Sequence, residues 1–395
     1  MKGFSRPLTG GALLLSLLLT GACGGAVTPA TPTSAEGRCV TSYDPAKDYF
    51  PVKQTLRHAA NFTLTYAKHY QTITVKQPAP GAKPETYVLL RCGTPDPKVA
   101  GATVVETPIE SLYSASTTHL PFVTGLGVLD RLKGVASAGF ITSAQVLEKV
   151  KAGAITEYAK GQEIDTEKVI AARPGVLMTG GTEDKAYGPL RQAGIKVVAN
   201  AEWLEATPLG RAEWIKLMAA LTGTEQQAGQ VFDKVEGDYR SLADKAKAAT
   251  AVPVLPGQMY QGQWSVPNGG SYVATLIKDA GGTYAWAGTS GPGSTTLDLE
   301  AVLAEAKDAK VWLATVNEWK SLADVEKADA RYAKFDAFGA GQVWSSNKTL
   351  GPGGGNDFFE RGVARPDLIL GDLVAILHPD LAPGHEFAFY QKLTR

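Results

Sequence analysis

The sequence predicts an α/β fold with two Rossmann-like lobes, each built on a central, mainly parallel sheet. One long backbone helix joins the lobes, and a β-rich, disulfide-stapled extension precedes them. Three observations lead to this prediction. Short apolar segments alternate with helical segments over residues 103–209 and again over 251–395, a pattern typical of parallel sheets. An amphipathic helical region over 210–250 separates the two halves. A β-type alternation fills residues 38–102.

The first element is an export signal over residues 1–22. Lys2 and Arg6 precede a short apolar run, and Leu19-Thr20-Gly21-Ala22-Cys23 follows it. This order describes a secretory signal, and the run is shorter than the ~20 apolar residues of a membrane-spanning helix. The string resembles the bacterial lipobox, which implies cleavage before Cys23 and acylation of that cysteine. A plain signal peptide with a coincidental cysteine is the alternative.

Residues 23–37 form a small, polar, proline-punctuated stretch that we interpret as a lipid-anchored tether. The protein is therefore expected on the cell envelope, facing the periplasm or the cell exterior, with the lipid as its only membrane contact. The 39 Lys and Arg residues balance the 39 Asp and Glu residues without a basic block. This balance argues against nucleic-acid binding, which depends on Lys and Arg contacts with phosphate.

The extension over residues 38–102 has alternating strands at 63–66 and 72–75 and an apolar strand at 87–90. Once Cys23 carries lipid, Cys39 and Cys92 remain in an oxidising compartment, where a disulfide between them is expected. Two separate buried thiols are the alternative.

The lobes follow. In the first lobe (103–209), strands are predicted at 103–105, 134–136, 175–178 and 195–198, with helices at 122–132, 143–151, 164–172 and 184–193. In the second lobe (251–395), strands are predicted at 253–255, 309–313 and 341–344, with helices at 367–377 and 384–393. The connecting helix over about 225–249 has a continuous apolar face and no internal proline. We therefore expect the lobes to move little relative to each other.

Five phrases carry a resemblance to a known family. They are Ser116–Pro121, Gly125-Leu126-Gly127 with Leu132–Val135, Ile164–Leu177, Leu297–Leu303, and Asn356–Gly362 with Arg365-Pro366-Asp367. In this order and spacing they resemble the class III substrate-binding proteins of ABC importers, which carry ferric siderophores, haem and cobalamin. Gly175 stands where that family usually has Asp.

The resemblance implies that Glu167 and Glu300 dock into the two subunits of an ABC permease. Both begin matching helices, where a carboxylate is stabilised by the helix dipole and is free to pair with Arg. The simpler interpretation is the general preference of Glu for the start of a helix.

A ligand is expected in the cleft between the two lobes, outside the carboxyl ends of the strands. Loops leaving these ends supply Thr118, His119, Phe140, Thr179, Gly180, Gly181 and Trp203 in the first lobe. The second lobe supplies Gln261, Trp264, Trp319, Asn356, Asp357, Phe358, Phe359, Glu360 and Arg361. For each tryptophan, a place in the hydrophobic core is the competing interpretation.

The sequence has no Gly-x-Ser-x-Gly elbow, P-loop or His-Glu-x-x-His motif, so an enzyme is not expected. Its five histidines form no tight pair, so we expect neither a cofactor nor a protein-bound metal site. The resemblance implies a monomer that binds a metal chelate, with a weakly charged ferric siderophore ahead of cobalamin and haem. A surface lipoprotein hydrolase and a structural envelope lipoprotein are the alternatives of other classes.

Overall fold

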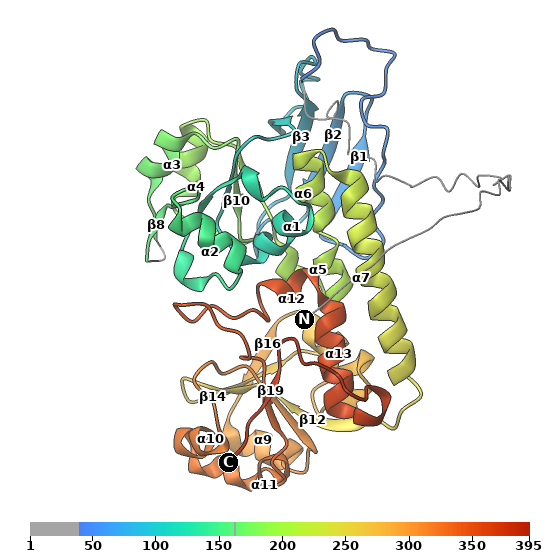
Figure 1. Cartoon of the computed structure of the whole chain (residues 1–395), viewed down its shortest axis with the longest axis vertical. Helices are drawn as coiled ribbons and strands as arrows, with labels where there is room; N and C mark the ends of the chain where they lie inside the picture. Colours follow the sequence, from blue (N-terminus) through green and yellow to red (C-terminus); the bar gives the residue numbers. More distant parts are fainter. Residues whose placement is uncertain (1–38, 162) are drawn as a thin grey trace, which may run out of the picture. The chain divides into compact units, whose positions relative to one another are not determined.

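A four-stranded sheet begins the part of the chain that the computed structural model describes, residues 39–161 and 163–395 (Figure 1). Its strands are β1 (Phe62–Tyr66), β2 (Tyr70–Val75), β3 (Glu85–Arg91) and β4 (Thr103–Thr107). The first three strands are antiparallel neighbours, and β4 runs parallel to β3. Strand β4 was predicted as the start of the first lobe, but it completes this sheet, because Val104 pairs with Val88. The signal, the tether and Cys23 lie outside the described residues.

The predicted disulfide is confirmed. Cys39 is bonded to Cys92, directly after β3. The backbone N–H of Val40 also donates to the carbonyl of Cys92 at 2.8 Å. The start of the described chain is therefore fixed to the extension sheet.

The first lobe has a parallel sheet in the order β11-β10-β5-β6-β7. The strands are β5 (Leu112–Ser114), β6 (Leu132–Val135), β7 (Thr156–Glu157), β10 (Val176–Thr179) and β11 (Val197–Ala199). The helices of this lobe are α1 (Leu120–Gly125), α2 (Ala144–Lys151), α3 (Thr166–Ala172) and α4 (Tyr187–Gln192). Short elements complete it: β8 (Ala159–Lys160), β9 (Glu163–Ile164), and the 3-10 turns η1 (Thr117–His119), η2 (Leu129–Arg131), η3 (Ala138–Phe140) and η4 (Glu202–Leu204). The central strand, β5, was not predicted.

The helical region expected at 210–250 consists mainly of three helices: α5 (Pro208–Ala212), α6 (Ile215–Thr222) and α7 (Glu225–Ala246). Gly223 ends α6 with a φ of +68°, a left-handed conformation that suits glycine. Helix α7 is the expected backbone helix, and it runs unbroken for 22 residues. Its Phe232 is buried in the core of the first lobe and its Tyr239 in the core of the second. One helix therefore packs into both cores.

The second lobe has a sheet in the order β15-β12-β17-β18-β19, parallel except for β19. Its strands are β12 (Val252–Pro256), β15 (Gly282–Thr283), β17 (Val311–Ala314), β18 (Val343–Ser345) and β19 (Gln391–Lys392). An antiparallel sheet that was not predicted joins β13 (Gln258–Tyr260), β14 (Gln263–Pro267) and β16 (Ser294–Leu297). The helices are α8 (Tyr272–Asp279), α9 (Leu299–Ala306), α10 (Leu322–Ala328), α11 (Asp336–Gly339), α12 (Arg361–Ala364) and α13 (Pro366–Leu377), with turns η5 (Ala330–Lys334) and η6 (Pro379–Leu381).

The helix predicted at 384–393 is wrong. The buried carboxylate of Asp372, on α13, accepts the backbone N–H groups of Ala388, Phe389 and Tyr390. These bonds hold the tail extended, so that it enters the sheet as β19.

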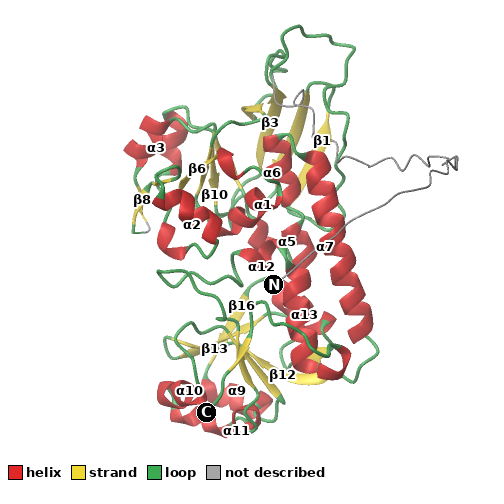
Figure 2. Ribbon diagram, viewed as in Figure 1, coloured by secondary structure: helices red, strands yellow, loops and turns green. Residues whose placement is uncertain are grey.

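The chain crosses between the lobes a second time, which the sequence did not indicate. Val363, on α12, is buried in the core of the first lobe, although the segments before and after it belong to the second. Helix α13 then runs beside α7 (Figure 2). The two lobes are thus joined by α7 and by the segment around α12.

Candidate functional site

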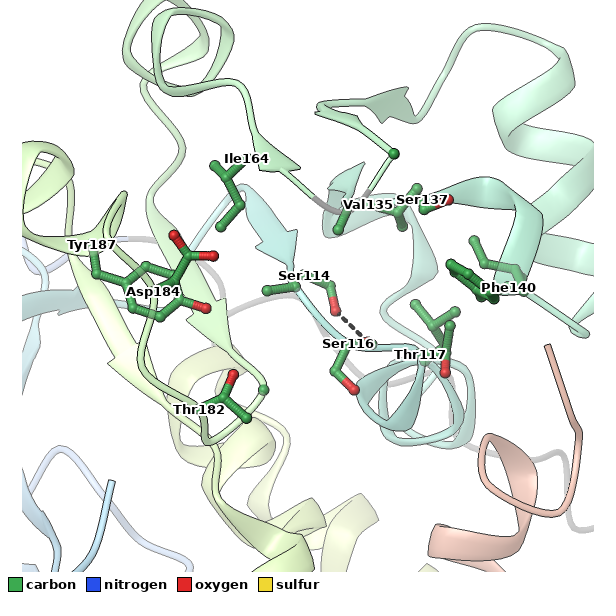
Figure 3. A pocket seen from close by; sticks show the side chains of 16 residues that line it. Ser114, Ser116, Thr117, Val135, Ser137, Phe140, Ile164, Thr182, Asp184 and Tyr187 are labelled. Atoms are coloured by element: carbon green, nitrogen blue, oxygen red, sulfur yellow. Dashed lines mark hydrogen bonds between the residues drawn. The ribbon is translucent and has the colours of Figure 1, made fainter. Parts of the chain in front are cut away.

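A cavity of the first lobe lies at the carboxyl ends of β5, β6 and β10 (Figure 3). It has a volume of about 440 Å³ and is open to solvent. This location agrees with the general position of ligands in open α/β sheets, and the volume suits a small molecule or part of a larger one. All of its described lining residues lie between Ser114 and Tyr187.

Hydroxyl groups dominate the polar wall of this cavity. They belong to Ser114, Ser116, Thr117, Ser137, Thr182 and Tyr187. The Ser114 hydroxyl donates to the carbonyl of Ser116 at 2.8 Å, which fixes the turn after β5. Burial raises the pKa of Tyr187 to about 12, so its hydroxyl keeps its proton at neutral pH. Because hydroxyls both donate and accept hydrogen bonds, this wall suits a polar, oxygen-rich ligand.

Two residues predicted to contact the ligand line the cavity, Phe140 and Gly180. Phe140 is 43% exposed, which is unusual for a phenylalanine and leaves its ring available to a ligand. A Cβ at Gly180 would lie 3.3 Å from the Cβ of Ser116, so a larger residue would crowd the turn after β5.

The other predicted residues of the first lobe surround the cavity without lining it. Thr118 shares a 2.9 Å hydrogen bond with Ser116, and Thr179 is buried beneath the loop. At Gly181, a Cβ would meet Ala201 at 2.7 Å. The indole N–H of Trp203 donates to the Gly181 carbonyl, so this half-exposed ring covers the outside of the loop.

His119 lies behind the cavity wall and is fully buried. Its Nδ1 lies 2.8 Å from the Ser114 hydroxyl. Burial lowers the pKa of His119 to about 3, so the imidazole is neutral. His119 therefore positions Ser114. The prediction that His119 contacts the ligand directly is wrong, because its side chain is not exposed.

Trp264 and Trp319 were also predicted to contact the ligand, and the structure corrects both. Trp264 has no exposed surface, and Trp319 is 6% exposed. Both rings pack against Trp312 and Tyr332 in the core of the second lobe. Gln261 is exposed at the tip of the hairpin between β13 and β14, away from the cavity lining.

The loop predicted to bind ligand at residues 356–361 is mainly a clasp between the lobes. The buried carboxylate of Glu360 accepts the backbone N–H groups of Thr142 and Ser143 at 2.8 and 2.9 Å. Asp357 accepts the Thr142 hydroxyl at 2.9 Å and the Nε–H of Arg361 at 2.8 Å. These hydrogen bonds tie the second lobe to the start of α2.

The remaining members of this loop have separate roles. The Asn356 amide donates to Asn317 at 3.0 Å. Phe358 is buried among Phe389 and Tyr390, whereas Phe359 is 42% exposed. Of the two aromatic residues, Phe359 is therefore the one with surface to offer a ligand.

A glycine-rich stretch just before this loop touches the turn that bears Phe140. The N–H of Gly353 donates to the carbonyl of Gly139 at 2.7 Å. A Cβ at Gly355 would lie 1.8 Å from the carbonyl oxygen of Phe140. Glycine is thus required for this approach of the two backbones. The second lobe contributes support for Phe140 rather than a side chain in the cavity.

Glu167 and Glu300 occupy equivalent places on the two lobes. Glu167 is exposed in the first turn of α3, and Glu300 is exposed in the first turn of α9. An aspartate caps each helix, Asp165 for α3 and Asp298 for α9. Arg331 contacts Glu300 at 3.1 Å, while Asp329 holds the same guanidinium. Both glutamates are geometrically able to reach a partner.

Among the described residues, no group of three or more His, Cys, Asp or Glu side chains is arranged to hold a metal ion. Within 39–161 and 163–395, no helix is both long and apolar enough to cross a membrane.

Sequence reasoning missed part of the cavity wall, namely Ser137, Thr182, Asp184 and Tyr187. Ser137 and Thr182 follow the ends of β6 and β10 within a few residues. Applying the strand-end rule to every polar residue of these loops, instead of favouring aromatic residues, would have found them.

Comparison with known proteins agrees with this geometry. Residues 114–348, more than half of the chain, match the periplasmic binding protein family. An uncharacterized lipoprotein of Methanocaldococcus jannaschii is 28% identical over 301 residues, covering 73% of this chain and 70% of that protein.

Solved structures share the fold at low identity. A periplasmic heme binding protein from Pseudomonas aeruginosa has 20% identity and a TM-score of 0.53, over 69% of this chain and 93% of its own. The periplasmic vitamin B12 binding protein of Vibrio cholerae has 16% identity and a TM-score of 0.52, over 70% of this chain and 99% of its own. The chain belongs to the periplasmic binding protein family, whose members bind substrates for ABC transporters and are not enzymes.

Proposed function

We propose that this protein is the lipid-anchored substrate-binding component of an ABC importer, and that it captures a metal chelate, a ferric siderophore, outside the cytoplasmic membrane. The observation that carries the proposal is the open, hydroxyl-lined cavity at the strand ends of a chain of this family. Acylation of Cys23 would supply the anchor, and the named lipoprotein relative supports it.

Delivery would use Glu167 and Glu300. Each carboxylate is exposed at a helix start, one on each lobe, and neither belongs to the cavity lining. Arginines of the two permease subunits would form charge-assisted pairs with them. At Glu300 such an arginine would take the place of Arg331, whose contact is at an exposed surface and therefore weak.

The ligand class can be tested by tryptophan-fluorescence titration of the purified protein. Trp203 packs on the loop beside the cavity and is half-exposed, so a bound chelate should quench it. Ferric hydroxamate and catecholate chelates, haem and cobalamin form the panel. Saturable quenching by a ferric siderophore that disappears in Trp203→Phe supports the proposal. Saturable quenching only by haem or cobalamin would reassign the ligand. If no compound of the panel quenches the fluorescence, a metal-chelate cargo is refuted.

A further inference from the structure

The cavity wall contains one negatively charged side chain among its hydroxyl groups. Among its described lining residues, Asp184 is the one with an ionisable acidic or basic side chain. Its Oδ1 accepts the backbone N–H of Ala186 at 2.8 Å, and it has no ion pair with any described residue. Figure 3 shows the Asp184 carboxylate beside the Tyr187 ring on one side of the cavity.

Two lysines share an outer hollow with Asp184, and each contacts another carboxylate. Lys185 contacts Glu163 at 2.6 Å, and Lys160 contacts Asp165 at 3.3 Å. Both lysines line an open hollow next to the cavity together with Asp184, Glu163 and Glu183, and Lys185 also interacts electrostatically with Asp184. The cavity and its mouth therefore have a negative balance, and no Arg or Lys side chain lines the described wall.

A charge of this kind selects among ligands more strongly than hydroxyls do. Serine, threonine and tyrosine hydroxyls accept or donate according to need, so they bind charged and uncharged groups alike. A half-buried carboxylate instead forms charge-assisted hydrogen bonds with a cation and repels an anion.

We propose that this cavity selects positively charged ligands, with Asp184 receiving an ammonium or similar cationic group of the cargo. The Tyr187 hydroxyl and the serine and threonine hydroxyls then bind the oxygen-rich remainder, against the exposed ring of Phe140. This inference rests on the proposed function, because the cation is taken to be part of a metal chelate. It excludes strongly anionic chelates, such as tris-catecholates, as the preferred cargo.

The test uses one iron core with three charges. The ferric complex of desferrioxamine B carries a pendant ammonium group, its N-acetyl derivative is neutral, and its N-succinyl derivative is anionic. Titration calorimetry with the mature chain carrying Cys23→Ala compares their affinities. We expect affinity to fall from the cationic to the anionic complex by roughly tenfold in total, the size expected for a partly exposed charge pair.

Two variants separate charge selection from a structural effect. Asp184→Asn keeps an oxygen that accepts the Ala186 N–H, so the fold should remain, and thermal melting checks this. It should reduce the ratio between cationic and anionic complexes to within about twofold. Asp244→Asn makes the same charge change at an exposed position of α7, which contributes no residue to the cavity lining, and it should keep the ratio.

The outcomes distinguish the two proposals. Equal binding of the three complexes, preference for the anionic one, or an unchanged ratio in Asp184→Asn would overturn the charge selection while leaving siderophore binding in place. If none of the three complexes binds, the ferric-hydroxamate cargo is refuted, and the inference fails with it.

Discussion

Replacing Glu360 should loosen the contact between the lobes without unfolding either of them. Glu360 is 2% exposed, and its two carboxylate oxygens accept N–H groups at the start of α2. Phe140, which lines the cavity, lies two residues before Thr142. Glu360→Ala therefore removes a clasp that also steadies one wall of the candidate site.

The cost can be worked from these two hydrogen bonds. A hydrogen bond to a charged group contributes about 1.5–3 kcal/mol. Burial raises the pKa of Glu360, which shows that burying the charge offsets part of this gain. Because Thr142 and Ser143 are only partly buried, water can replace the lost acceptor. We therefore expect a local loss of about 2 kcal/mol rather than the sum of both bonds.

Hydrogen–deuterium exchange measures this loss where it occurs. A local loss of about 2 kcal/mol should speed exchange roughly 30-fold in peptides covering 138–143 and 351–360. Peptides from β10 and β17 should be unchanged. Glu318→Ala is the matched control, since Glu318 is exposed. Exchange within about threefold of the parent protein in both peptides would refute the clasp.

Four further predictions follow from separate features. Cys23→Ala should leave the protein soluble after cell fractionation, and retention in salt-washed membranes would contradict the lipid anchor. Charge reversal by Glu167→Arg or Glu300→Arg should abolish uptake in cells while chelate affinity stays within about twofold, because neither residue lines the cavity; weakened binding would instead place that residue at the ligand. Glu213→Gln should destabilise the protein by about 3–5 kcal/mol in urea unfolding, since it removes the negative charge that balances the buried ammonium of Lys216 and leaves that ammonium with the neutral carbonyl of Thr55; a loss below about 1 kcal/mol would contradict this value. Small-angle scattering should show almost the same radius of gyration with and without bound chelate, and a clear decrease would reveal a hinge.

The sequence predicted those elements whose pattern is local. Strands β1, β2 and β3 were found because alternation or an apolar run marks each of them. Helix α7 was found because one apolar face runs along its whole length. In contrast, β5 has three residues, all buried, which is too short to show any period. The predicted C-terminal helix failed because Asp372 determines the conformation of that tail from a distant part of the chain.

The site was harder to predict than the fold. The position of a loop relative to a strand end was predictable, but the direction of a side chain was not. Trp264 was expected near the end of a strand, at the edge of the sheet, but its ring lies in the aromatic core of the second lobe. Glu360 lies in the expected loop, yet its partners are backbone N–H groups of the other lobe, which leave no pattern in the sequence. Asp184 was not predicted, because nothing in the sequence distinguishes it from other loop aspartates. Its proposed role depends on the absence of Arg and Lys side chains from the described cavity wall.

The two connections between the lobes have different consequences for the candidate site. Helix α7 joins the cores along one side and contributes no residue to the cavity lining. The second connection passes through Glu360 and the glycines at 351–355, which contact the turn bearing Phe140. A ligand that displaces Phe140 must therefore also displace backbone of the second lobe, because a gap too small for a Cβ separates them at Gly355. If a ligand displaces Phe140, occupancy of a cavity lined by one lobe is coupled mechanically to the other lobe, which carries Glu300, the second residue proposed to dock, even without rotation of the lobes.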